Sequence, residues 1–440
     1  MDANIRSRID SLIRREVSPA MGCTEPVAIA LAVAYASSLL SDEASSLRVW
    51  LSANMLKNAM GVGIPGTGKI GIPIAIALGA VLRCPERQLE VLDGFSSEAL
   101  ARAEAIVEAG LIEINLKEEP ELDRLYIEVL AHDAQGNEAK AIIQKHHTHL
   151  HHLSLNGENR LNQTEEPFGC SETLTTSSSL LDEDITLNFA LVYDYATTAP
   201  LEDLNFIYEA ALQNKAVGEY ALSRDYGHGV GRMIGSRVGE RYLGSSSLTK
   251  MLKYTSAACD ARMDGAPMMV MSNTGSGNQG ITATLPVLTF AEAEGCSREE
   301  TTRALMMSSL LVVYIKQLLG RLSGLCGMVV SGVGSSAALV YLMGGSREQS
   351  AYAVHNMIGN VAGMICDGAK PSCSLKASTG VYSGMLAALL AMEHRVVTSI
   401  EGIVEREVDD TIANLATLGR EAMMATDQKV LELMTNKKNR

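Results

Sequence analysis

The sequence has 440 residues, a formal net charge of −14 and 47% hydrophobic residues, of which few are aromatic. Domains usually contain about 100–200 residues, so this length indicates two or three domains. The acidic balance, without a basic stripe, argues against nucleic acid or an anionic membrane as the main partner.

The first 153 residues mix helical and strand patterns. Pro26 directly follows Cys23, Thr24 and Glu25, and it suits the first turn of a helix. Alternation of apolar and polar residues indicates the strands. The predicted helices are 3–17, 26–40, 74–82 and 96–110, and the predicted strands are 47–53, 88–94, 111–117, 124–132 and 139–153.

Residues 154–182 are polar and concentrate Gly, Pro, Ser and Thr, which indicates a linker. We therefore expect an α+β chain, with a mixed α/β domain over 1–153 that contains the GCTEP motif, and a larger all-α domain over 183–440. Helical periodicity dominates that second domain. Its predicted helices are 184–196, 201–223, 227–242, 281–294, 298–345 in at least two pieces, 347–362, 379–393 and 408–434.

Several features bear on the compartment. The N-terminal segment is charged and amphipathic and lacks the apolar core of a secretory signal. Eight cysteines without a dense framework fit a reducing compartment, and we expect the cytoplasm. The uncharged run 322–346 is long enough for a bilayer, but its frequent Gly and Ser favour a pair of buried core helices.

Residues 63–69, GIPGTGK, match the first part of a phosphate-binding loop. The next residue is Ile70, where a hydroxyl group is needed to hold magnesium, and Pro65 removes one backbone donor. A tight turn that approaches another backbone segment is the favoured interpretation.

A second glycine-rich motif, GSGNQG at 275–280, follows a strand-like segment and precedes a helix, as a dinucleotide fingerprint requires. That helix meets Pro286 within two turns, and no regular series of parallel strands follows. Backbone N–H groups at a helix N-terminus also suit a carboxylate, and we favour that ligand. The expected substrate-binding residues of this loop are Ser272, Asn273, Ser276, Gly277, Asn278 and Gln279.

Five histidines lie between positions 146 and 152. On a strand, His147, His149 and His151 would share one face, which permits a metal site. No cysteine or acidic ligand lies at suitable spacing, so a solvated strand edge is favoured.

Two cysteines lie in a segment that disfavours a continuous helix. Cys366 and Cys373 flank Gly368 and Pro371, and a loop there brings both sulfurs round one centre. Cys326, from a helix rich in small residues, is a candidate third ligand, although spacing alone leaves this open. Four other cysteines lie in ordinary sequence surroundings, and small buried or surface thiols account for them: Cys84, Cys170, Cys259 and Cys296.

Together with these cysteines, four motifs resemble the L-cysteine desulfidase family: GCTEP at 22–26, PGTG at 65–68, DARMDGAP at 260–267 and SNTGSGNQGITATLP at 272–286. That family is related to the iron–sulfur L-serine dehydratases, whose α-domain the C-terminal half resembles. The resemblance implies a [4Fe–4S] cluster held by Cys326, Cys366 and Cys373, and a catalytic role for Cys23.

The resemblance also raises the question of a fourth cluster ligand. It implies that the dehydratases supply a removable cysteine from their C-terminus, whereas this sequence ends LELMTNKKNR. The fourth iron is therefore expected to be open to solvent or to be occupied by another group, such as Cys23. In the histidine run, His147 with Thr148 fits the family pattern, and His147 is expected at the substrate.

The implied reaction is β-elimination from a small L-amino acid, which converts L-cysteine to pyruvate, ammonia and hydrogen sulfide. Cys23 precedes a predicted helix N-terminus, where the helix dipole favours a thiolate that takes the α proton. Glu25 is expected to bind the substrate ammonium group. Arg262 is a second candidate for binding the substrate carboxylate. Alternatively, Arg262 forms a salt bridge with Asp260 or Asp264.

Other functions remain open from sequence alone. L-serine dehydration is the nearest, because the same cluster chemistry activates a hydroxyl leaving group. A dinucleotide-dependent oxidoreductase would use the GSGNQG loop, and a cluster-holding sensor would bind iron without turnover. Helix surfaces rich in Gly, Ala and Met permit a homodimer.

Overall fold

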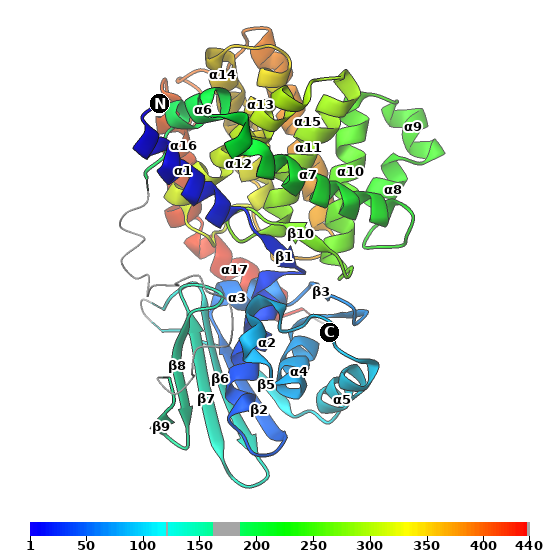
Figure 1. The fold of residues 1–440 in the computed structure, drawn as a ribbon, viewed down its shortest axis with the longest axis vertical. Coiled ribbons are helices and arrows are strands. Elements are labelled where there is room, and N and C mark those ends of the chain that lie inside the picture. The colour runs from blue at the N-terminus through cyan, green and yellow to red at the C-terminus, as the bar shows by residue number, and fades with distance from the viewer. Residues whose placement is uncertain (120–121, 162–184, 438–440) are drawn as a thin grey trace.

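The computed structural model describes residues 1–119, 122–161 and 185–437. In the view of Figure 1, a large helical region lies above a smaller region built on a β-sheet. This arrangement confirms the predicted α+β fold, with a mixed sheet in the N-terminal part and a larger helical part after it. The domain boundaries at 153 and 183 stay a prediction.

The sheet has six strands in the order β5-β2-β6-β7-β8-β9. β2 and β5 run parallel, and the other neighbours run antiparallel. Every second residue of β7 is buried, so one face of the sheet lies against a core. The strands are β2 (Ala44–Leu51), β5 (Ile112–Leu116), β6 (Tyr126–Asp133), β7 (Glu138–Gln144), β8 (Leu150–Leu155) and β9 (Glu158–Asn159).

Helices cover one face of this sheet. α2 (Thr24–Ser38) packs on β6 and β7 and against α4 (Ile72–Leu82), which in turn contacts α5 (Ser97–Glu108). α2 and α4 approach closely at Gly79, where an added Cβ would lie 2.4 Å from the carbonyl oxygen of Ala30. The short helix α3 (Ala53–Ala59) and a small hairpin of β3 (Gly63–Ile64) and β4 (Lys69–Ile70) face the helical region.

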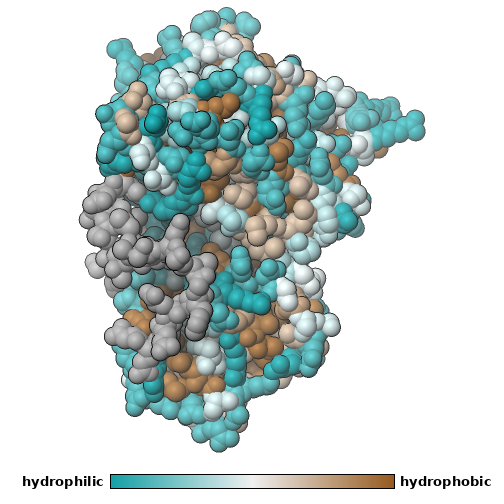
Figure 2. Space-filling view, in the orientation of Figure 1, coloured by the Kyte–Doolittle hydropathy of each residue, from teal (hydrophilic) through white to brown (hydrophobic). Residues whose placement is uncertain are grey.

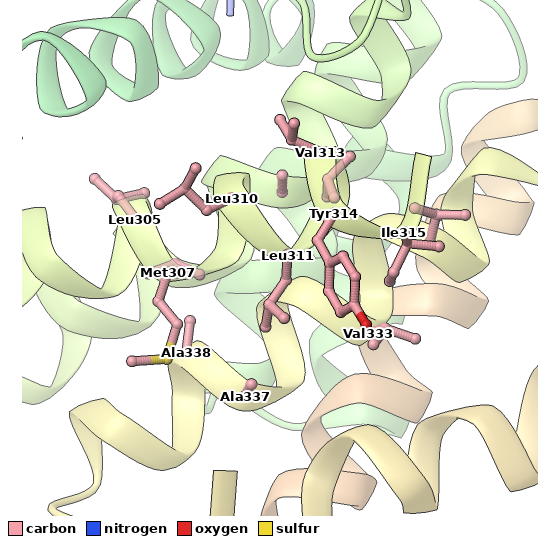
Figure 3. Close-up of a cluster of buried hydrophobic side chains, with 14 of the residues drawn as sticks. Leu305, Met307, Leu310, Leu311, Val313, Tyr314, Ile315, Val333, Ala337 and Ala338 are labelled. Atoms are coloured by element: carbon pink, nitrogen blue, oxygen red, sulfur yellow. The ribbon is translucent and has the colours of Figure 1, made fainter. Parts of the chain in front are cut away.

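The helical region is built around α12 and α13, whose apolar side chains form the core shown in Figure 3. Its helices are α6 (Phe189–Thr198), α7 (Leu201–Leu222), α8 (Val230–Ile234), α9 (Arg237–Leu243), α10 (Ser247–Met263), α11 (Gly277–Glu294), α12 (Arg298–Leu319), α13 (Gly327–Leu342), α14 (Arg347–Val361), α15 (Cys373–Met392), α16 (Val408–Thr417) and α17 (Met424–Thr435).

The first and last described helices each contact a part of the molecule that is distant in sequence. α1 (Ala3–Glu16) contributes to the core of the helical region and contacts α12. The strand after it, β1 (Pro19–Met21), pairs antiparallel with β10 (Met269–Met271) of that region. α17 lies against α3 of the N-terminal part. The two regions are therefore joined at both ends of the described chain.

Two described helices are long and apolar enough to cross a membrane, α12 and α15. Within the most apolar window of each, 83% of the residues of α12 and 44% of those of α15 are buried inside the protein. The uncharged run 322–346 contains one helix, α13, and not the expected pair, but α13 is almost entirely buried, as expected for a core helix. Hydrophilic residues cover much of the face of the helical region seen in Figure 2.

Several predicted elements differ from the structure. Residues 88–94 are not a strand, because Pro85 opens a 3₁₀ turn (Pro85–Glu90) in which Gln88 has a positive φ. The segment 139–153 is a hairpin of β7 and β8. Residues 154–161, predicted as linker, complete β8 and form β9, and 162–182 lie outside the described residues.

The helical predictions also need changes. α10 was not predicted, since its Thr, Ser and Lys residues hide its apolar pattern. The helix expected at 227–242 is broken at Gly235 into α8 and α9. α15 begins six residues before the predicted 379, and the helix predicted over 408–434 is divided by a π-turn (Leu418–Ala422).

Candidate active site

Three segments bring the predicted cluster cysteines together. Cys326 immediately precedes α13, and Cys373 is the first residue of α15. Cys366 lies in the loop before α15 and is joined to the Cys326 segment by two backbone hydrogen bonds. The N–H of Cys326 donates to Met364 at 2.9 Å, and the N–H of Cys366 donates to Gly324 at 2.7 Å. This short antiparallel pairing holds together the two segments that contain Cys326 and Cys366.

The thiols are close enough to influence one another's ionisation. Burial, and next the neighbouring sulfur of Cys366, raise the pKa of Cys326 to about 12. Burial also raises the pKa of Cys373, against the opposing charge of Lys370, and Cys366 raises it further. Such thiols hold their protons at neutral pH, so binding of a metal group there would release protons.

The donor set fits an iron–sulfur cluster, which cysteine thiolates hold in proteins. Among the described residues, no three His, Cys, Asp or Glu side chains converge closely enough to hold a single metal ion. A four-iron cluster is wider than one ion, so its ligands need not converge to that degree. Cys326 and Cys373 also lie at helix N-termini, where the helix dipole stabilises a thiolate.

Cys23 belongs to the same group of thiols. It is the N-cap residue of α2, is only 2% exposed, and packs with Val62, Met263 and Cys373 in a small buried cluster. Burial raises the pKa of Cys23 to about 12, and the adjacent guanidinium of Arg262 opposes this rise. The structure therefore places the predicted catalytic thiol beside one of the predicted ligands.

The glycine-rich segment 63–69 supports Cys23 instead of forming a phosphate cradle. A Cβ on Gly22 would lie 2.5 Å from a ring carbon of Pro65. A Cβ on Gly63 would lie 2.4 Å from the backbone of Asp264. Both approaches agree with the predicted tight turn against another backbone segment.

Arg262 links Cys23 to the loop between β10 and α11. It is 5% exposed, and its Nη2 donates to the carbonyl of Gly22 at 2.9 Å while Nη1 donates to Asn278 at 3.2 Å. Neither predicted carboxylate pairs with it: Asp264 accepts from the N–H of Gly227, and Asp260 from the N–H of Gly231. Its substrate-binding role stays a prediction.

The polar side chains of this loop bond to other protein groups, some within the loop and some on neighbouring segments. Three side chains donate to neighbouring segments: Ser272 to the carbonyl of Ser18, Asn273 to the carbonyl of Ser309, and Asn278 to the sulfur of Met263. Within the loop, Gln279 donates to the carbonyl of Asn273 and to the hydroxyl of Thr274, and Ser276 accepts from the N–H of Gln279. Gly277 begins α11 and packs directly on Arg262. Substrate binding by this loop stays a prediction.

The structure disfavours a dinucleotide at this loop. β10, the strand before it, pairs antiparallel with β1 in a sheet of two strands, whereas the dinucleotide fold requires a parallel sheet. Pro286 does not end the helix, because α11 continues through it while packed against α10, α12 and α13.

Glu25 and His147 lie near this loop and close enough for their charges to interact. Asn58 donates to Glu25 at 3.1 Å, and burial lowers the pKa of His147 while the charge of Glu25 raises it. His147 lies in the turn between β7 and β8. The expectation that it shares a strand face with His149 and His151 is therefore wrong. Its Nε2 atom is buried and has no hydrogen-bond partner in the described structure.

Sequence reasoning missed Asn58 and Lys316. Lys316, in the last turn of α12, is 8% exposed, and burial lowers its pKa to about 7, with Cys366 and Glu25 among the charges that raise it. It donates to the carbonyl of Arg321 at 2.7 Å and lines a cavity of about 340 Å³ that Thr274 also lines. The sequence did contain a signal for Lys316, because it is the single charged residue in the apolar stretch 304–319.

The chain has clear relatives. Residues 86–432, which include the three predicted ligands, match the family described as serine dehydratase alpha chain. The UPF0597 protein of Porphyromonas gingivalis is 55% identical over 438 residues, covering 100% of both chains. That of Parabacteroides distasonis is 50% identical over 437 residues, covering 99% of this chain and 100% of its own. That of Oleidesulfovibrio alaskensis is 41% identical over 432 residues, covering 98% of each.

Proposed function

Because the chain belongs to the serine dehydratase alpha chain family, we propose that it is an iron–sulfur lyase that releases hydrogen sulfide from L-cysteine. Pyruvate and ammonia are the other products, and the protein works in the cytoplasm, where thiols stay reduced. The sequence resemblance to L-cysteine desulfidases favours L-cysteine. The family description favours L-serine dehydration as the second candidate.

The meeting of four thiols from separate segments is the observation that supports this proposal most directly. Cys326, Cys366 and Cys373 lie around one buried region, with Cys23 packed against Cys373. We propose that the first three hold a [4Fe–4S] cluster. When bound by three cysteines, such a cluster supplies one iron that acts as a Lewis acid toward the leaving sulfur.

The chain's own groups provide for the remaining chemistry. Cys23 Sγ must lose its own proton before it accepts the α proton, because burial raises the pKa of this thiol to about 12. The guanidinium of Arg262 lowers that pKa and so stabilises the thiolate. Glu25, held by Asn58, binds the substrate ammonium group. His147 Nε2, buried and unpartnered, is available to the substrate carboxylate together with the N-terminus of α11. Loss of the α proton to Cys23 and cleavage of the Cβ–S bond, with the sulfur leaving as sulfide, convert L-cysteine to aminoacrylate. Aminoacrylate then tautomerises and is hydrolysed by water to pyruvate and ammonia without further catalysis.

The test is anaerobic purification followed by measurement of iron, acid-labile sulfide, and pyruvate formed from L-cysteine and from L-serine. We expect iron and sulfide in the protein and more pyruvate from L-cysteine. Cys366→Ala should lose most of the iron, whereas Cys296→Ala, which changes a thiol outside the site, should keep it. Greater pyruvate yield from L-serine would establish the dehydratase instead, and iron without either product would favour a sensor.

A further inference from the structure

Lysine ammonium groups hold four consecutive carbonyl groups of the loop that contains Cys366. An irregular loop has no helix or sheet ladder to satisfy its backbone, so these carbonyls need other partners. The bonds run from Lys376 to the carbonyl of Ile365, from Lys57 to Cys366, and from Lys370 to Asp367 and Gly368, at 2.9, 3.2, 2.8 and 3.2 Å.

Lys57 differs from the other two lysines in origin and in burial. Lys370 and Lys376 come from the loop and from α15, are about one-quarter exposed, and both pair with Asp367. Lys57 comes from α3 in the N-terminal part of the chain, and its side chain is only 1% exposed. A buried ammonium group is costly unless it is paired and hydrogen-bonded, so its partners define its role.

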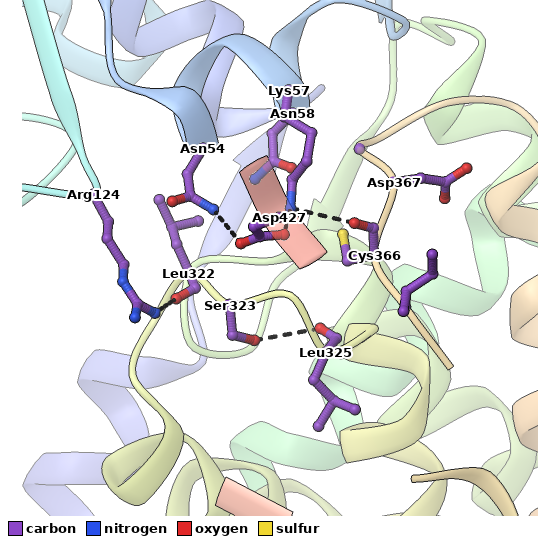
Figure 4. Close-up of polar contacts among 12 residues, drawn as sticks. Asn54, Lys57, Asn58, Arg124, Leu322, Ser323, Leu325, Cys366, Asp367 and Asp427 are labelled. Carbon is purple, nitrogen blue, oxygen red and sulfur yellow. Dashed lines mark hydrogen bonds and ion pairs between the residues drawn. The ribbon is translucent and has the colours of Figure 1, made fainter. Parts of the chain in front are cut away.

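The partner of Lys57 is Asp427 on α17, as Figure 4 shows. The Nζ atom of Lys57 lies 2.6 Å from Asp427 Oδ1, and Asn54 of α3 donates to Asp427 Oδ2 at 3.0 Å. Asp427 thus holds the ammonium group in the position from which it reaches the carbonyl of Cys366.

Backbone contacts fix the same loop from two further directions. The N–H of Cys366 donates to Gly324 at 2.7 Å, so the main chain of Cys366 is held both at its N–H and at its carbonyl. Gly368 has a φ of +88°, and a Cβ there would lie 2.2 Å from the carbonyl oxygen of Lys57. α3 and the cysteine loop are therefore in direct contact through both main chain and side chain.

We propose that Lys57 is a positioning residue for Cys366, and that α17, through Asp427, is part of the support of the iron–sulfur site. The inference rests on the proposed function, which makes Cys366 a cluster ligand. When Lys57 is absent, the carbonyl of Cys366 loses its donor and the loop can move, so the thiolate leaves the iron more often. Groups that orient metal ligands typically change metal affinity by about 10–100-fold when removed.

The decisive variant is the double substitution Lys57→Met with Asp427→Asn. It removes both buried charges but keeps an acceptor for Asn54, so the unfolding temperature should stay close to that of the wild type. We expect transfer of iron to a ferrous chelator, followed anaerobically, to be about 10–100-fold faster than in the wild-type holoprotein. Lys429→Met is the matched control, because it removes an exposed lysine from α17, and it should release iron at the wild-type rate.

A second measurement uses the metal-free protein. Alkylation of Cys366 by iodoacetamide, followed by mass spectrometry, should be faster in the double variant than in Lys429→Met. Wild-type rates of iron release and alkylation in the double variant would show that the pair serves stability alone, and would overturn the inference. Full retention of iron by Cys366→Ala would instead contradict the assignment of the ligand, which leaves the alkylation result to decide the role of Lys57.

Discussion

Buried polar atoms without partners gather around the loop between β10 and α11. They include His147 Nε2, Arg262 Nε, Asn273 Oδ1 and Ser309 Oγ, which have no hydrogen-bond partner in the described structure. Folded proteins pair most buried polar atoms, because an unpaired one costs free energy. A small polar ligand at this loop would recover that cost, which supports an amino acid as the substrate.

His355 should make stability depend on pH. Burial lowers the pKa of His355 below its ordinary value of 6.5, so the unfolded chain takes up a proton more readily than the folded chain. The stabilisation is complete above 6.5 and is lost as the pH falls from there toward the folded pKa. His355→Gln should flatten this part of the curve of unfolding free energy against pH, measured with urea. The exposed His394, changed to Gln, should leave the curve as it is.

The contact between α2 and α4 depends on a residue without a side chain. An added Cβ at Gly79 would lie 2.4 Å from the carbonyl of Ala30, and a backbone carbonyl in a buried helix cannot easily move away. Gly79→Ala should therefore lower the free energy of unfolding by about 1–3 kcal/mol, the usual cost of overpacking. Gly363→Ala is the control, since a Cβ there meets nothing within 4 Å. Equal stability of the two variants would contradict the close packing.

The long helices α1, α7, α12 and α14 were predicted with start residues that agree with the structure. α10 was missed, because it buries Thr, Ser, Asp and Arg side chains together with its apolar ones, so its sequence shows no apolar stripe. The segment 88–94 alternates like a strand, yet its first three residues end a 3₁₀ turn that Pro85 opens, and the rest forms a turn. Periodicity reports which residues face a core, but not which local backbone conformation brings them there.

The candidate site was recognisable in sequence where its residues form short motifs. GCTEP and GSGNQG indicated Cys23, Glu25 and the α11 loop, and the structure places them near one another. Lys57 and Asp427 gave no such signal, because 370 residues separate them and neither lies in a motif. Pairings between distant single residues depend on how the two regions pack, which the chain order does not reveal.

The pair of Lys57 and Asp427 joins the N-terminal part of the molecule to the last described helix. Asp427→Ala should lower the free energy of unfolding of the cluster-free protein by about 3–5 kcal/mol, because it leaves the buried Lys57 charge uncompensated. Urea denaturation measures this change. Asp225→Ala breaks an exposed ion pair with Arg232 and should have little effect. A similar small effect for both would show that water reaches Lys57.

The same pair places the two regions in a temporal order during synthesis. Ribosomes add about 5–20 residues per second, so Asp427 is made roughly 20–70 s after Lys57. Throughout that interval the N-terminal region holds a lysine whose counter-charge does not yet exist. Under the proposed function, iron is therefore expected to enter after translation, once the final helix has docked, and a nascent chain that still lacks this helix should hold iron poorly.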